Sequence, residues 1–124
     1  MLSLLADGPI RCLDVNARAL HRLHMSATSP PSEADRAALI RAIAEAGDRA
    51  AYIALFEFYA PRIKAQAMRF GLNPEDAEDV AQDAMLSLWR RATQFDGTRG
   101  TASAWVFSIA TNARIDRMRR DRHL

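Results

Sequence analysis

The spacing of apolar residues predicts a series of helices from Ser32 to the end of the chain. Hydrophobic side chains recur every three or four positions there, which is the period of a helix that buries one face. No stretch alternates apolar and polar residues with the period of two that a half-buried strand requires. We therefore predict an all-α fold, a compact bundle of three to four helices.

Capping residues predict where the first of these helices begins and ends. Ser32 and Asp35 form a weak capping box, and the helix should run to about Ala46. Gly47 should end it, and Asp48 can cap the helix that follows.

The second helix should bury a stripe of large residues and end at Gly71. Pro61 lies inside this pattern and should kink or split the helix near Ala60, because proline removes one backbone donor. The stripe consists of Tyr52, Leu55, Phe56, Tyr59, Ile63, Ala67 and Phe70.

Two further helices are predicted in the C-terminal half. Asn73 caps the third, with Pro74 at its first position. The fourth should begin near Thr101 or Ser103 and run to about Arg120. The core face of the third helix comprises Ala77, Val80, Ala81, Ala84, Met85, Leu88, Trp89 and Ala92.

The chain divides into a short N-terminal segment and one helical domain. Residues 1–31 have weak helical patterning and end in the Ser/Pro-rich stretch "MSATSPPS", so we expect a weakly ordered extension and linker. Residues 32–124 are then the helical domain, which suits a chain of 124 residues.

Charge is distributed very unevenly along this domain. Residues 73–88 hold five acids and no base, whereas residues 111–124 hold five arginines and two aspartates. Lys64 is the single lysine among 17 basic residues. Arginine suits phosphate and base edges, although a biased composition explains its abundance equally well.

No residue pattern points to catalysis or a metal site. Cys12, His21 and His24 are too few and too poorly patterned for zinc, and no glycine-rich phosphate loop or nucleophile motif occurs. We expect neither an enzyme nor a bound cofactor or small-molecule substrate. A single cysteine, and no apolar run of the roughly 20 residues a membrane span needs, predict a cytoplasmic protein without membrane contact.

The third helix carries an unusual outer face. An apolar residue, Leu86, stands among charged and amide side chains, which indicates either a chance exposed leucine or a docking surface for a basic partner protein. That face comprises Glu78, Asp79, Gln82, Asp83, Leu86 and Arg90.

The loop and helix near the C-terminus form the strongest candidate site. Phe95, Asp96, Thr98, Arg99 and Thr101 combine an aromatic ring with small polar and basic groups, as capture of an unstacked base requires. The next helix has an apolar first half and an arginine-rich end. Between them lies Asn112, whose side-chain amide can hydrogen-bond to the edge of a base. A favourable C-terminal charge pattern alone also explains those arginines.

Three blocks of the sequence resemble region 2 of bacterial sigma factors of the extracytoplasmic-function (ECF) class, in the sigma-70 family. They are "LFEFYAPRI" at 55–63, "AEDVAQDAMLSLWRRATQFD" at 77–96 and "TASAWVFSIATNARIDRMRR" at 101–120. The resemblance implies the region 2 helical fold and binding to both RNA polymerase and promoter DNA. It also implies an anti-sigma factor as a partner.

Carried over by position, the resemblance assigns two sets of residues. The docking set would meet the coiled-coil clamp helices of the polymerase β′ subunit: Asp79, Gln82, Asp83, Leu86 and Arg90. The DNA set would recognise and melt the −10 element on the non-template strand: Phe95, Asp96, Thr98, Arg99, Thr101, Trp105, Ser108, Asn112, Arg114, Arg117, Arg119 and Arg120.

Family members continue into a helix-turn-helix domain that reads the −35 element, and these 124 residues do not include one. The leading hypothesis is a transcription-initiation domain. The alternative is an interaction-only module that occupies polymerase or an anti-sigma factor without initiating transcription.

Overall fold

The computed structural model describes residues 29–122, and within them every regular element is helical. In chain order these are α3 (Glu33–Ala46), α4 (Arg49–Arg69), α5 (Pro74–Arg91), a short 3-10 turn η1 (Ala92–Gln94) and α6 (Ala102–Arg122). The all-α prediction is confirmed. The predicted extension falls almost entirely on residues 1–28, outside the described part, as do Cys12, His21 and His24.

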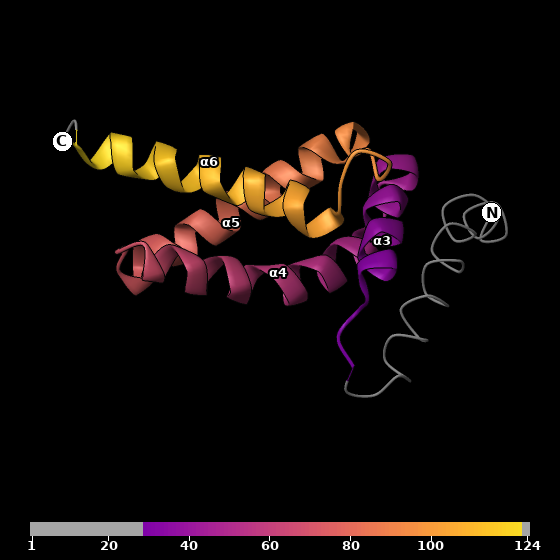
Figure 1. The fold of residues 1–124 in the computed structure, drawn as a ribbon, viewed down its shortest axis with the longest axis horizontal. Coiled ribbons are helices and arrows are strands. Elements are labelled where there is room, and N and C mark those ends of the chain that lie inside the picture. The colour runs from indigo at the N-terminus through magenta and orange to yellow at the C-terminus, as the bar shows by residue number, and fades with distance from the viewer. Residues whose placement is uncertain (1–28, 123–124) are drawn as a thin grey trace, which may run out of the picture.

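The three long helices lie together, and α3 crosses one end of them (Figure 1). α5 packs against both α4 and α6, so it is the central helix of the bundle. The loop that precedes α6 passes beside α3 at the same end of the molecule (Figure 1). This arrangement brings α3 next to the candidate loop, which lies far from it in the sequence.

Local chemistry explains the helix ends. Both hydrogen bonds of the Ser32–Asp35 capping box form, at 3.1 and 3.0 Å, so the shorter aspartate still completes the box. Gly47 ends α3 with a φ of 59°, a left-handed conformation that favours glycine. The carboxylate of Asp48 then accepts from the backbone N–H of Ala51 and caps α4.

Small residues on α5 allow its neighbours to approach closely. Ala77, Ala81 and Ala84 are at most 1% exposed, and larger buried side chains from α4 and α6 fill the space around them. Tyr59 is the largest fully buried side chain. The predicted core face of α5 is buried as expected except for Trp89, which is half-buried and packs edge-on against Tyr52 with ring centroids 5.2 Å apart.

The possible split of α4 at Pro61 and the placement of Phe70 were wrong. Pro61 does not split the helix, which runs unbroken from Arg49 to Arg69, because buried residues on both sides of the proline hold the turn in place. Phe70 is not in the core: it lies beyond the end of α4, 54% exposed. The guanidinium of Arg114 covers its ring at 3.8 Å.

None of the helices in residues 29–122 combines the length and apolar character that crossing a membrane demands.

Candidate nucleic-acid and polymerase interface

The loop between α5 and α6 is built around an aspartate turn. The side chain of Asp96 accepts hydrogen bonds from the backbone N–H of Thr98 at 2.9 Å and from its hydroxyl at 2.6 Å. The N–H of Arg99 donates to the backbone carbonyl of Asp96 at 3.1 Å. Asp96 and Thr98 therefore hold the loop in a defined shape before any ligand binds.

These hydrogen bonds also favour the charged form of Asp96. The hydroxyl of Thr98, its backbone N–H and the nearby charge of Arg99 together lower the pKa of Asp96 below the ordinary value of 3.8, although slight desolvation opposes them. Asp96 therefore keeps its negative charge to a lower pH than an ordinary aspartate does.

Phe95 forms an aromatic wall for this loop. Phe95 is half-buried, with its ring centroid 5.3 Å from that of Trp105. The two rings are tilted by 51°, so each supports the other and leaves part of its surface accessible.

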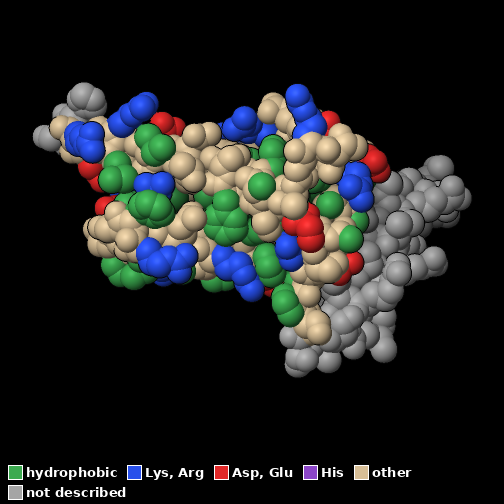
Figure 2. Space-filling view, viewed as in Figure 1, with side chains coloured by type: hydrophobic (Ala, Val, Ile, Leu, Met, Phe, Trp, Pro, Cys, Tyr) green, Lys and Arg blue, Asp and Glu red, His purple; other side chains and the backbone are tan. Residues whose placement is uncertain are grey.

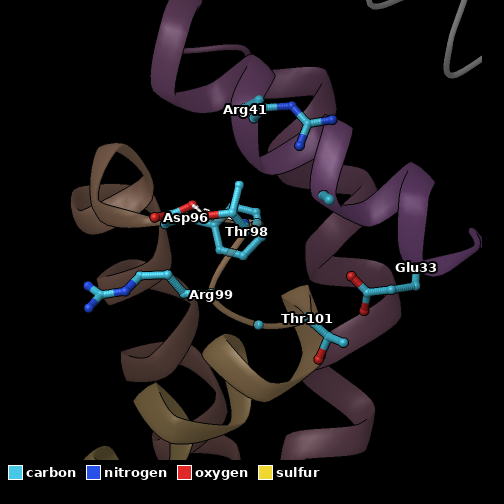
Figure 3. A pocket seen from close by; sticks show the side chains of 10 residues that line it. Glu33, Arg41, Asp96, Thr98, Arg99 and Thr101 are labelled. Carbon is cyan, nitrogen blue, oxygen red and sulfur yellow. Dashed lines mark hydrogen bonds between the residues drawn. The ribbon is translucent and has the colours of Figure 1, made fainter.

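The loop and α3 enclose an open hollow of about 810 Å³ (Figure 3). The loop contributes Phe95 and the polar residues predicted for base capture. The contribution of α3 was missed, because the hollow is completed by side chains distant in sequence. The full lining is Glu33, Ala37, Arg41 and the seven residues from Phe95 to Thr101.

The start of α6 is tied to α3 through a carboxylate that was also missed. Glu33 Oε2 accepts from the N–H of Ala102 at 2.7 Å, and Oε1 accepts from the N–H of Ser103 at 3.3 Å. The hydroxyl of Thr101 accepts from the N–H of Ala104 at 3.0 Å. Three backbone N–H groups at the start of α6 that have no partner within the helix are thereby hydrogen-bonded, two of them to a side chain of α3.

A polar network beside this cap joins three helices. Arg36 Nε of α3 donates to the hydroxyl of Tyr59 at 2.9 Å, and its Nη2 donates to the hydroxyl of Ser103 at 3.3 Å. The hydroxyls of Tyr59 and Ser103 lie 2.9 Å apart. The network fixes where α6 begins relative to α3 and α4.

The predicted DNA face of α6 continues from the loop. Trp105, Ser108 and Asn112 follow one another at helical spacing; Ser108 and Asn112 are exposed, and Trp105 is half-buried. Asn112 also lines a smaller hollow, of about 170 Å³, between α5 and α6. Asp83, predicted for polymerase docking, lines the same hollow, so the two predicted surfaces meet there.

Lys and Arg side chains gather at the C-terminal end of α6 (Figure 2), but the arginines of this helix fall into different environments. Arg117 forms ion pairs with two acids of α5, Asp76 at 2.7 Å and Asp79 at 3.3 Å. Arg120 approaches Asp83 at 3.8 Å, with both side chains largely exposed. Partial burial opposes the charge on Arg117, but the carboxylates outweigh it and raise the pKa of its guanidinium.

Arg119 differs from its neighbours. It is exposed, and within residues 29–122 no carboxylate lies at ion-pair distance from it. Arg114 is half-buried over Phe70. Of the four α6 arginines assigned to DNA, Arg119 is thus exposed without an ion pair, whereas Arg114, Arg117 and Arg120 each contact another side chain of the fold.

The outer face of α5 presents the predicted docking residues together. Gln82, Asp83, Leu86 and Arg90 are exposed, Leu86 by 43%, whereas Asp79 is half-buried beside Arg117. Across the described helices and loops, no group of three His, Cys, Asp or Glu side chains could hold a metal ion.

Comparison with known proteins identifies relatives of this chain. Residues 55–123 match the family described as Sigma-70 region 2. The ECF RNA polymerase sigma factor RpoE of Cereibacter sphaeroides is 41% identical over 95 residues, which are 77% of this chain and 52% of the relative. The ECF sigma factor SigK of Mycobacterium tuberculosis is 32% identical over 93 residues, 74% of this chain and 49% of the relative.

A solved structure agrees with these matches. It contains Rhodobacter sphaeroides SigE in complex with the anti-sigma ChrR, and it matches with a TM-score of 0.68 and 40% identity over 72% of this chain and 54% of that one. The chain therefore spans about half the length of the sigma factors that it resembles.

Proposed function

The chain belongs to the Sigma-70 region 2 family, as a region 2 domain of the ECF class, and from this premise we propose that it serves in transcription initiation by binding RNA polymerase and the melted −10 element. Sigma factors are initiation factors rather than enzymes. We accordingly propose that this domain recognises the −10 element and binds its melted strand.

The observation that carries the proposal is the hollow between the loop and α3. It offers an aromatic wall in Phe95, polar groups in Thr98 and Thr101, and the cation of Arg99. A flipped base needs such a combination, because stacking supplies affinity and edge contacts supply selectivity. The hydrogen bonds of Asp96 hold the loop ready, so little ordering is needed on binding.

The α6 face extends the proposed path of the strand. Trp105, Ser108 and Asn112 continue from the mouth of the hollow along one side of the helix. Arg119 lies further along and is available for a phosphate. Arg117 contributes mainly by joining α6 to α5, since it pairs with two carboxylates there, whereas Arg120 makes one long, exposed contact with Asp83 and stays accessible to a phosphate.

The polymerase contact is proposed for the outer face of α5. Leu86 supplies an apolar anchor, and Gln82, Asp83 and Arg90 surround it with polar groups that can set orientation. We assign this face to the clamp helices of the β′ subunit by the resemblance.

An anti-sigma factor is a second proposed partner. The similar structure holds SigE together with the anti-sigma ChrR, and this chain is 40% identical to that SigE over the shared part. An interaction-only role, in which the domain is bound without initiating transcription, remains the alternative function.

Reconstitution with core RNA polymerase distinguishes the two functions. We expect the domain to co-elute with core enzyme and to give the complex a preference for single-stranded −10 DNA over a scrambled strand. Co-elution without any gain in strand preference would favour the interaction-only role. Failure to co-elute would contradict the polymerase assignment.

A further inference from the structure

Helix α3 supplies one whole wall of the loop hollow. Glu33, Ala37 and Arg41 are spaced four residues apart, so they lie on one face of the helix, and all three line the hollow. Figure 3 shows Glu33 and Arg41 projecting from α3, opposite the loop that carries Asp96 and Thr98. The resemblance assigned no site residue to this helix.

The acid of this wall is already engaged. Both carboxylate oxygens of Glu33 accept hydrogen bonds from the backbone of α6, and Oε1 also lies 3.4 Å from Arg36 Nη2. Its negative charge is therefore offset by the helix N-terminus and by Arg36, which weakens its repulsion of an anionic ligand.

Arg41 is the unengaged member of the wall. Its side chain is exposed, and no carboxylate among residues 29–122 lies within ion-pair distance of it. A Cβ placed on Gly97 would lie 3.8 Å from Arg41 Nη1 and 3.7 Å from the ring of Phe95. The guanidinium thus stands next to the loop backbone, close to the aromatic wall.

The opposite rim of the hollow carries a second cation. Arg99 extends from the loop away from α3, so the two arginines flank the hollow from different sides (Figure 3). Asp96, the remaining charged lining residue, faces the N–H and hydroxyl of Thr98. If a base stacked against Phe95, the phosphate backbone of its strand would pass close to Arg41 or to Arg99.

We infer that Arg41 is a further nucleotide-contacting residue, which binds a phosphate next to the base captured in the hollow. The inference rests on the proposed function and extends it to α3. Its ligand is single-stranded DNA, whose phosphate the planar guanidinium can bind through two N–H groups. The contact would add affinity without reading sequence, because phosphates are alike in every nucleotide.

The test compares Arg41→Ala and Arg41→Lys in the complex with core RNA polymerase. Arg49→Ala is the matched control, since Arg49 is also exposed, lies on α4 and does not line the hollow. Fluorescence anisotropy with a single-stranded −10 oligonucleotide is recorded over a salt series. We expect Arg41→Ala to weaken binding on the order of fivefold at low salt and to reduce the salt slope by about 0.7, the value of one phosphate contact on a single strand.

Replacing single phosphates with neutral methylphosphonates identifies the contact. One replacement next to the captured base should weaken binding by the unsubstituted protein and have little further effect on Arg41→Ala. Arg41→Lys should recover part of the affinity, and Arg49→Ala should change nothing. The thermal unfolding midpoints of the variants should agree, which would show that the loss of affinity comes from a lost contact and not from a less stable fold.

Two results overturn different claims. If the unsubstituted complex prefers the −10 strand and Arg41→Ala binds it with the same affinity and salt slope, the assignment of Arg41 is wrong and the base site stands. If the unsubstituted complex shows no preference for the −10 strand, the proposed function fails, and the inference about Arg41 fails with it.

Discussion

Arg117 of α6 reaches Asp76 and Asp79 of α5 at once, with Nη2 2.7 Å from Asp76 Oδ1 and Nη1 3.3 Å from Asp79 Oδ2. The family resemblance had assigned Arg117 to DNA binding and Asp79 to polymerase binding. Their contact joins the two helices that carry the proposed DNA and polymerase surfaces. The acid-rich segment and the arginine-rich end are therefore partly complementary within one fold.

Arg117→Ala should destabilise the domain, whereas Arg119→Ala should not. Removing Arg117 leaves Asp76 and Asp79 without the cation that they share, so we expect a modest fall in the free energy of unfolding, since the network is largely at the surface. Arg119 has no such partner. Urea denaturation of the two variants measures the difference; equal stability would contradict a structural role for Arg117.

Glu33→Gln should loosen the start of α6. The amide nitrogen of glutamine is a donor, so it would face a backbone donor where a carboxylate oxygen now accepts, and we expect a loss of about 1 kcal/mol. Hydrogen exchange at the amides of Ala102 and Ser103 should become faster.

Glu45→Gln is the control for this change. Glu45 lies on the same helix, is exposed and caps no other element. Unchanged exchange rates at Ala102 and Ser103 in Glu33→Gln would show that Glu33 does not hold the junction.

Asp83→Arg combined with Leu86→Ala should weaken binding to the β′ clamp helices. The change reverses one charge of the docking face and removes its apolar anchor. The pair of Asp83 with Arg120 is long and exposed, so the unfolding free energy should change by less than about 0.5 kcal/mol. Glu57→Arg, on an exposed position of α4, is the matched charge reversal, and a pull-down in which both variants bind alike would refute the docking assignment.

The loop should resist mild acid. Hydrogen bonds from Thr98 depress the pKa of Asp96, so the folded chain takes up this proton less readily than the unfolded chain. The stabilising contribution is complete above the ordinary value of 3.8 and disappears only as the pH falls through the lower, folded pKa. Thr98→Val removes the hydroxyl donor and keeps the backbone N–H donor, so in NMR the titration of Asp96 should move up toward 3.8. Identical titration in both proteins would show that the hydroxyl of Thr98 does not stabilise the carboxylate.

The helix bounds could be predicted from the sequence because caps are local. Ser32, Asp48 and Asn73 each bond to a backbone N–H three residues away, and such partners are visible in any short window. The continuity of α4 at Pro61 and the exposure of Phe70 could not be predicted, for a different reason. Whether packing holds a proline-containing turn, or whether an aromatic residue at a helix end is buried, depends on the neighbouring helices.

Loop residues that line the hollow were among those predicted from the sequence, but its α3 wall was not. Glu33 and Ala102 are 69 positions apart, and only the crossing of α3 over the bundle brings them together. The roles of the arginines depend similarly on the rotation of α6, which turns Arg117 toward α5 and Arg119 toward solvent.

The most direct test of base capture compares Phe95→Ala with Arg119→Ala in the polymerase complex. Fluorescence anisotropy over a salt series would measure binding to the single-stranded −10 sequence and to a scrambled strand. Phe95→Ala should erode the preference for the −10 strand, since lost stacking costs roughly 1–3 kcal/mol per base. Arg119→Ala should weaken both strands alike and lower the salt slope. The same sequence-independent loss in both variants would contradict capture of a base in the loop hollow.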